Sequence, residues 1–452
     1  MGNCFLASLV LFSFLDPLLS APAPAPAAPR PATSSQQSSP PRAPAPTVAP
    51  APPTTFLGTR PPVFLLPGSG ASTLDSTWTN STLKAACSPT AATSTIWLQD
   101  INTLTGDPTC IQAALLLTFN STTSLWQNNS NAQITPHDYG GVTGVVGIPV
   151  DNVFLHPIWS AMVQQLQSQG YTIGSNLFGA PYDWRVSFYT LQQIGYFARL
   201  KNSIEAAVKA NNNTRAVICG HSLGTLVSTY FLTSATTAAW REEYVAAYFS
   251  YSGLYAGASV AFTQFIEGNS YGFAVSPSRL WAAARTWGSL VQRSPVPHVW
   301  GNQVLISSRA KKYTASDMRQ LLYDLNLTQQ VSTYDRIYSS VANLTMNPLN
   351  VDTYCIMGNS IQTAVNLAYD VPTFNGSVPL SGANVTYGGG DGVINQISLD
   401  ECLSLDPVAV YNFTGIDHGG VLGDPMVMKI FLKALSTYTN PPSPSATSNM
   451  HG

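Results

Sequence analysis

The sequence predicts a doubly wound α/β fold, in which helices cover both faces of a mostly parallel sheet. Residues 63–66 (VFLL) and 216–219 (AVIC) are continuous apolar runs, as expected for parallel strands that are buried on both faces. Apolar residues recur at helical spacing over about 157–169 and again over about 222–233. Buried strands that alternate with such helices indicate this fold class.

The rest of the chain adds further elements to this alternation. In chain order we expect a strand end and loop at 178–185, a helix near 190–210, a strand at 303–306, a helix at about 315–325, strands at 353–357 and 385–387, and a final helix at 424–435.

Two stretches interrupt the alternation. Residues 80–135 are polar and weakly periodic, which predicts a subdomain inserted between early strands. Residues 255–300 are rich in glycine, proline and aromatic residues, which suits a lid or cap.

The ends of the 452-residue chain do not look globular. The apolar start (1–20) is typical of a signal peptide, with an uncleaved signal anchor as the alternative. The Pro/Ala/Ser-rich segment 21–56 predicts a flexible stalk, and 438–452 a flexible tail. The predicted folded body is therefore 57–437.

Charge and sequons bear on the class of partner and the compartment. Charged residues make up 9% of the chain and the formal net charge is −2, so nothing argues for nucleic acid or for electrostatic membrane docking. Sequons for N-glycosylation favour the secretory pathway, with a secreted or a lysosome- or vacuole-like luminal location. They lie at Asn80, Asn120, Asn128, Asn212, Asn326, Asn343, Asn375, Asn384 and Asn412.

The chain has six cysteines, which differ in context. Cys4 belongs to the predicted leader, and Cys219 lies in an apolar strand as a small buried side chain. The remaining four cysteines permit three disulfide pairings; they are Cys87, Cys110, Cys355 and Cys402. No Cys-x-x-Cys motif or His/Cys cluster suggests a metal site.

The candidate nucleophile is Ser222, in the motif Gly220-His221-Ser222-Leu223-Gly224. A serine that attacks from a sharp strand-to-helix turn needs neighbours without bulk, and this motif follows a predicted strand and opens a predicted helix. A second match, at 268–272, centres on Ser270 but has neither neighbour, so we interpret it as an ordinary loop.

The base that would act on Ser222 is predicted to be His418. After Ser222 only His298, His418 and His451 remain; His298 lies in the lid-like stretch and His451 in the tail. His418 lies in a glycine-bounded loop just before the final helix, where an α/β-hydrolase keeps its base.

The acid must precede His418 and follow a strand, and Asp391 in the glycine-rich run 388–392 meets both conditions. Its weaker rivals are Asp370, Asp400 and Asp406, whereas Asp417 adjoins the base and is expected to point elsewhere. The oxyanion needs two backbone N–H donors, which we assign to Leu223 and to Ser69 in the loop after the first strand.

At this point the sequence resembles the family of lecithin:cholesterol acyltransferase and lysosomal phospholipase A2. The matching motifs occur in order along nearly the whole body, and the Pro-Tyr-Asp-Trp-Arg run is the most specific of them. They are Pro62-Val63, Leu66-Pro67-Gly68, Thr95-Ile96-Trp97-Leu98, Ala180-Pro181-Tyr182-Asp183-Trp184-Arg185, the serine motif, Gly390-Asp391-Gly392 and His418.

The resemblance implies an α/β-hydrolase fold with cap and lid insertions, and disulfides Cys87–Cys110 and Cys355–Cys402. It also implies a membrane-binding insertion at about 79–125, in which Trp97 contacts the lipid; internal packing of Trp97 is the alternative. For Asp183 and Arg185 we expect an internal ion pair.

The implied reaction is phospholipase A-type cleavage through a Ser222 acyl-enzyme, with the acyl group passed to water or to a lipid alcohol such as a sterol. It needs no cofactor. The chain departs from the family at 252–257 and has the small Ser69 in the oxyanion loop, so the resemblance does not carry over the acceptor. Two alternatives are an esterase or thioesterase for soluble substrates and a non-catalytic lipid-binding surface protein.

Overall fold

The computed structural model describes residues 58–88, 91–97, 108–150, 153–155, 158–269, 271, 276–346 and 348–439. The predicted leader and stalk, nearly all of the predicted tail, and Ser270 lie outside the described residues.

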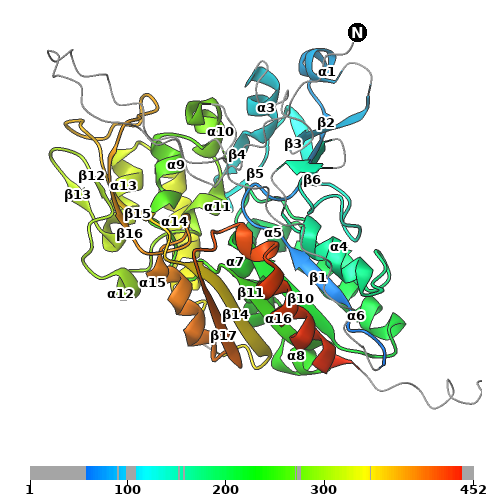
Figure 1. Cartoon of the computed structure of the whole chain (residues 1–452). Coiled ribbons are helices and arrows are strands. Elements are labelled where there is room, and N and C mark those ends of the chain that lie inside the picture. The colour runs from blue at the N-terminus through cyan, green and yellow to red at the C-terminus, as the bar shows by residue number, and fades with distance from the viewer. Residues whose placement is uncertain are drawn as a thin grey trace, which may run out of the picture.

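A parallel sheet forms the centre of the molecule (Figure 1). Its six strands have the order β17-β14-β11-β10-β1-β9, and each neighbouring pair is parallel. The strands are β1 (Val63–Leu66), β9 (Leu177–Gly179), β10 (Ala216–His221), β11 (Val245–Tyr251), β14 (Asp352–Asn359) and β17 (Ala409–Thr414). The predicted α/β fold is confirmed.

Helices cover both faces of this sheet, because its strands are apolar on both sides. Val63 and Leu65 pack with apolar residues of α4 (Ser160–Ser168) and α16 (Pro425–Leu435). Phe64 and Leu66 face a second cluster. To that cluster belong residues of α5 (Phe188–Gln193), α6 (Tyr196–Ala210), α7 (Leu223–Tyr230) and α8 (Ala238–Tyr244).

The early insertion is a small unit beside the sheet, at the upper right of Figure 1. It contains a three-stranded antiparallel sheet, a hairpin and two helices. Its elements are β2 (Leu74–Trp78), α1 (Ser81–Cys87), β3 (Thr93–Trp97), α3 (Pro108–Leu115), β4 (Leu117–Asn120), β5 (Leu125–Asn128) and β6 (Ala132–Pro136). The short pair β7 (Ile148–Val150) and β8 (Val153–Leu155) follows it.

A mostly helical cap lies between β11 and β14, at the upper left of Figure 1. It continues well beyond residue 300, the predicted end of the lid. Its helices are η2 (Ser259–Ala261), α9 (Thr263–Ile266), η3 (Pro277–Leu280), α10 (Trp281–Ala284), α11 (Gly288–Val291), α12 (Pro297–Trp300), η4 (Ala315–Asp317), α13 (Met318–Asp324) and α14 (Thr328–Ala342).

A second sheet joins this cap to the segment after β14. Its order is β13-β12-β15-β16, with β12 (Ile306–Ser307), β13 (Lys312–Tyr313), β15 (Thr363–Ala368) and β16 (Asn384–Gly388). The strands predicted at 303–306 and 385–387 therefore belong to this sheet and not to the central one. The helix predicted at 190–210 is two helices, separated at Gly195, whose φ of 82° belongs to the left-handed region.

Two disulfides are present, Cys87–Cys110 and Cys355–Cys402, in the pairing that the resemblance implies. The first joins α1 to α3 and the second joins β14 to η5 (Asp400–Leu405). Cystines of this kind fit an extracellular or luminal protein. No helix in the described part of the chain is long and apolar enough to cross a membrane.

Candidate active site

Ser222 lies at the turn between β10 and α7. Its φ of 54° and ψ of −124° fall outside the regions that L-residues ordinarily occupy. Its N–H donates to the Tyr251 carbonyl at 3.0 Å, which holds this strained backbone against β11. Backbone strain of this kind costs about 1–3 kcal/mol and gathers at functional sites.

Two glycines make room for this turn. A Cβ on Gly224 would lie 2.5 Å from the Leu66 carbonyl oxygen, so the start of α7 approaches the end of β1 as only glycine allows. A Cβ on Gly68 would lie 2.9 Å from the Ser222 Cβ. The loop after β1 is therefore held directly against the serine.

His418 and Asp391 form a buried pair. The Nδ1 of His418 lies 2.8 Å from Oδ2 of Asp391, and the His418 N–H donates to the Asp391 carbonyl at 2.8 Å. The other carboxylate oxygen accepts from the N–H groups of Val393 and Ile394, at 3.0 and 2.7 Å. Burial alone would raise the pKa of the Asp391 carboxyl, but His418 and these N–H donors lower it below its usual value.

The elements bring the three predicted residues to one edge of the sheet. Ser222 follows β10 and His418 follows β17, while Asp391 bridges to Ile361, just beyond the end of β14. The carboxyl ends of parallel strands meet at one edge, which is where open α/β sheets place their sites.

His221, to which the sequence analysis gave no role, links the serine turn to the His418 loop. Its Nε2 donates to the His418 carbonyl at 2.9 Å, and the two rings lie 4.7 Å apart. Burial and the neighbouring His418 lower the pKa of His221 to about 3, so it is neutral at ordinary pH. The sequence signal for the linking role of His221 is its position directly before Ser222 in the serine motif.

The rival residues lie elsewhere. Asp370 pairs with Arg309 on the surface, where 84% of the aspartate side chain is exposed. Asp417 accepts from the Gly420 N–H, and His298 is exposed on α12. Asp400 and Asp406 are exposed as well.

The two predicted oxyanion donors flank Ser222. Leu223 is the first residue of α7, so its N–H has no carbonyl partner within the helix. Among the described residues, neither this N–H nor that of Ser69 donates a hydrogen bond. The Ser69 hydroxyl lies 3.3 Å from the Tyr271 hydroxyl.

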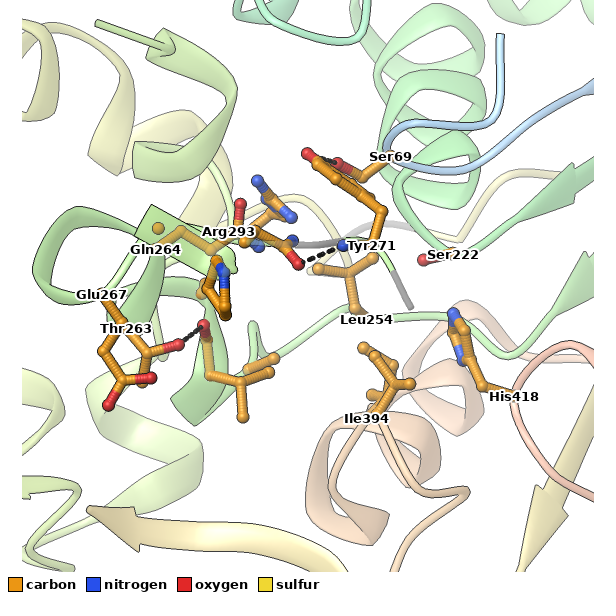
Figure 2. A pocket seen from close by; sticks show the side chains of 17 residues that line it. Ser69, Ser222, Leu254, Thr263, Gln264, Glu267, Tyr271, Arg293, Ile394 and His418 are labelled. Carbon is orange, nitrogen blue, oxygen red and sulfur yellow. Dashed lines mark hydrogen bonds between the residues drawn. The ribbon is translucent and has the colours of Figure 1, made fainter. Parts of the chain in front are cut away.

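A cavity of about 170 Å³ opens onto this site, and Ser69, Ser222 and His418 line it. Much of its remaining wall is apolar, from Leu254, Ala258, Val260, Ala261, Pro277, Val393 and Ile394. In the view of Figure 2, Ser222 and His418 lie at one end and Thr263, Gln264 and Glu267 at the other, with Arg293 and Tyr271 between them. The cavity thus combines an apolar wall for a hydrocarbon chain with polar groups away from the serine.

Comparison with known proteins shows a similarity to one family. The family model for lecithin:cholesterol acyltransferase matches residues 92–307, which include the serine turn and most of the cap. Over these residues the chain is similar to the lecithin:cholesterol acyltransferase family.

Curated relatives agree with this assignment. The chain is 28% identical over 313 residues to lecithin-cholesterol acyltransferase-like 1 of Oryza sativa subsp. japonica, a match that covers 65% of this chain and 69% of the relative. It is 28% identical over 264 residues to phosphatidylcholine-sterol acyltransferase of Gallus gallus, covering 57% and 62%. Lysosomal phospholipase A and acyltransferase of Homo sapiens is 24% identical over 349 residues, covering 76% and 82%.

A solved structure supports the fold alone. A chain from the crystal structure of the Tle4-Tli4 complex superposes with a TM-score of 0.50 at 13% identity, over 84% of this chain and 98% of that one.

Trp97, for which membrane contact and internal packing were the two expectations, packs internally. It is 1% exposed, and its Nε1 donates to the Gly70 carbonyl at 2.6 Å. Its ring contacts those of Trp184 and Tyr271 at 5.1 and 5.2 Å. Of the two alternatives for Trp97, the structure therefore has internal packing, because the loop after β1 and the cap enclose the indole.

The Pro-Tyr-Asp-Trp-Arg run, residues 181–185, supports the site through its hydrogen bonds. Arg185 pairs with Asp183 at 2.6 Å, as expected, and also donates to the Ala114 carbonyl and to Oδ1 of Asn128. The Tyr182 hydroxyl donates to the Pro67 carbonyl at 2.8 Å. This run thus ties the early insertion to the loop that carries Ser69.

The segment in which this chain departs from the lecithin:cholesterol acyltransferase family also reaches the cavity. Leu254 lines it, while the Tyr255 hydroxyl is buried against the Ser250 and Tyr248 hydroxyls at 2.8 and 3.1 Å. The described residues contain no group of three or more His, Cys, Asp and Glu side chains that could hold a metal ion.

Proposed function

We propose that this chain is a serine-dependent phospholipid acyl-hydrolase and O-acyltransferase, in which Ser222, His418 and Asp391 form the catalytic triad. The observation that carries the proposal is the buried Asp391–His418 pair in the same site as Ser222, which occupies a strained turn in a largely apolar cavity. Similarity to the lecithin:cholesterol acyltransferase family supports the phospholipid as substrate.

The proposed cycle has two halves. Ser222 Oγ attacks the carbonyl carbon of a phospholipid acyl ester, and His418 takes its proton through Nε2. The ester C–O bond then breaks, His418 returns the proton to the departing alkoxide, and lysophospholipid leaves. Water or a lipid alcohol such as a sterol next attacks the acyl-enzyme, with His418 again as base, and Ser222 is regenerated.

The hydrogen bonds around His418 suit this role. Because Asp391 accepts from Nδ1, it fixes the tautomer in which Nε2 is free to take a proton. The His418 carbonyl is held by His221, so the loop is anchored on both sides of the imidazole. The unpaired N–H groups of Ser69 and Leu223 would bind the oxyanion.

Access to lipid is the second part of the proposal. The chain would act as a peripheral protein at a membrane or lipoprotein surface, with the insertion at about 79–125 as its membrane-binding unit and with the cap as its lid. The predicted leader would direct it to a secreted or a lysosome- or vacuole-like luminal location, which its disulfides suit.

Acyl-labelled phosphatidylcholine vesicles, with and without a sterol, diacylglycerol or ceramide, test this function. We expect wild type to release label as free fatty acid or as an acylated alcohol, and Ser222→Ala to release none. Ser270→Ala removes the serine of the second G-x-S-x-G match and is the matched control, expected to keep wild-type activity. Release by both wild type and Ser222→Ala, or no release by wild type in any vesicle, would contradict the proposal.

A further inference from the structure

Arg293 is a buried cation without an acidic partner in the described part of the chain. It is 7% exposed, and it lines the catalytic cavity. In that part of the chain, no ion pair joins Arg293 to a carboxylate. This holds for the carboxylate of Glu267 as well, although Glu267 lines the same cavity. Burying an unpaired charge costs free energy, so an arginine in this position calls for an explanation.

The hydrogen bonds of Arg293 leave part of its guanidinium unused. Its Nε donates to the Ser289 carbonyl at 3.3 Å, and the Tyr271 hydroxyl lies near the guanidinium. Among the described residues its Nη2 has no partner. Burial lowers the pKa of Arg293, but an arginine keeps its charge throughout the physiological range.

A second unsatisfied group lies in the same cavity. Gln264 is 7% exposed, and its Oε1 has no hydrogen-bond partner among the described residues. An amide and a guanidinium that both lack partners in one cavity form a site for a polar ligand, because buried polar groups are otherwise nearly always paired. The guanidinium carries a positive charge and only N–H donors, so the group that it binds is an anion, whereas the Gln264 oxygen is an acceptor and would take a donor.

The position of Arg293 relates this anion to the ester that Ser222 attacks. The Tyr271 hydroxyl that contacts Arg293 lies 3.3 Å from the hydroxyl of Ser69, the predicted oxyanion residue. In Figure 2, Arg293 lies between the Ser222 end of the cavity and its far polar end. In a glycerophospholipid, a few covalent bonds separate the phosphate from the acyl esters, so both groups fit one continuous cavity.

We propose that Arg293 binds the phosphodiester of the phospholipid and thereby selects phospholipids over neutral esters. A guanidinium suits this task, since its planar N–H groups match the oxygens of a phosphate. The proposal rests on the proposed phospholipid reaction and adds to it the residue that recognises the head group.

The test compares two substrates in the same enzyme. We expect Arg293→Met to lower kcat/KM for phosphatidylcholine about 10–100-fold while it changes that for a neutral short-chain nitrophenyl ester less than twofold. Arg293→Lys should restore part of the loss because it restores the charge. Arg285→Met is the matched control: this arginine donates to the Phe265 and Leu325 carbonyls and does not line the cavity, so the ratio of the two activities should stay at the wild-type value.

Inhibition of neutral-ester hydrolysis identifies the anion. Glycerophosphocholine should inhibit wild type and should inhibit Arg293→Met about tenfold more weakly. Equal inhibition of both proteins by glycerophosphocholine would overturn the proposal. So would a result in which Arg293→Met weakens inhibition by free fatty acid but not by glycerophosphocholine, because the bound anion would then be a carboxylate. Parallel loss of both activities in Arg293→Met would also overturn it.

The outcome separates this proposal from the function on which it rests. If wild type cleaves phosphatidylcholine and Arg293→Met keeps the wild-type ratio, only the role of Arg293 fails. If wild type cleaves the neutral ester but never the phospholipid, the phospholipid function fails too.

Discussion

In the proposed mechanism, the reactivity of Ser222 comes from the residues that hold it in place rather than from its own chemistry. Its backbone, at φ 54°, is fixed by the Tyr251 carbonyl, and Gly68 has no side chain that would clash with it. Two histidines lie near Ser222 and make different hydrogen bonds. His418 bonds to a carboxylate, whereas His221 is neutral and bonds to a carbonyl. The sequence motif therefore predicts where these residues lie, and their hydrogen bonds decide which histidine can act as the base.

Asp391→Asn should lower kcat about 10³–10⁴-fold while the fold is kept. The amide can present its NH₂ group to Nδ1 and thereby favour the wrong imidazole tautomer. The measurement is acyl release from phosphatidylcholine vesicles, together with the free energy of unfolding. Asp417→Asn, which alters the carboxylate next to His418, is the control and should stay within a few-fold of wild type. Similar losses in both variants would argue against Asp391 as the orienting acid.

His221 should make the protein less stable in acid. Its pKa is lowered from 6.5 in the unfolded chain to about 3 in the fold, so between these values the unfolded chain binds more protons. The free energy of unfolding should therefore fall as pH decreases through this window, by about 1 kcal/mol per pH unit from this group.

Urea unfolding of wild type and His221→Gln between pH 7 and pH 4 measures this effect. The variant should be less stable than wild type at pH 7 but should lose less stability as the pH falls. Identical pH dependence in the two proteins would show that His221 is not buried in its neutral form.

Elements differ in how far their sequence predicts them. The strands β1 and β10 and the helix α7 are predictable because continuous apolar runs and helical spacing are local patterns. The 15-residue helix α14 escaped prediction: its buried Val331, Tyr334, Ile337 and Val341 are separated by many Ser, Thr and Gln residues, and its N-cap has no side-chain hydrogen bond. β17 alternates between half-buried and exposed residues, as an edge strand does, and only its pairing with β14 defines it.

The residues of the candidate site also differ in how far the sequence predicts them. The order serine, acid, histidine and the scarcity of histidines made the residues of the proposed triad predictable. Arg293, Gln264 and Tyr271 were not predictable, because the packing of the cap, and no local pattern, brings them to the serine.

The disulfide Cys87–Cys110 should stabilise the early insertion locally. It closes a loop with a sequence separation of 23 and joins α1 to α3, away from the central sheet. Replacing both cysteines by serine should cost about 2–4 kcal/mol within this unit. Hydrogen exchange should then show lost protection in α1 and α3, with β1 and β10 as protected as before. Loss of protection in the central sheet as well would mean that the insertion unfolds together with the core.

The whole molecule places its polar chemistry at one edge of an apolar sheet. Ser69, Ser222 and His418 follow three of the parallel strands, Asp391 lies beside the end of a fourth, and the cap closes over them. Because charged residues make up only 9% of the chain, a buried arginine in the cavity stands out as a specific feature and not as part of a charged surface. This arrangement suits a substrate with hydrocarbon chains and one anionic group.

The most direct test of the account is to find which residue a phospholipid attacks covalently. A phosphatidylcholine analogue that carries a reactive phosphonate in place of the acyl ester forms a stable adduct with an activated serine. Peptide mapping of the wild-type adduct should locate it on Ser222 alone, and Ser222→Ala should remain unmodified. An adduct on Ser270 or on any other serine, or hydrolysis of phosphatidylcholine by a protein that the analogue never modifies, would contradict the account.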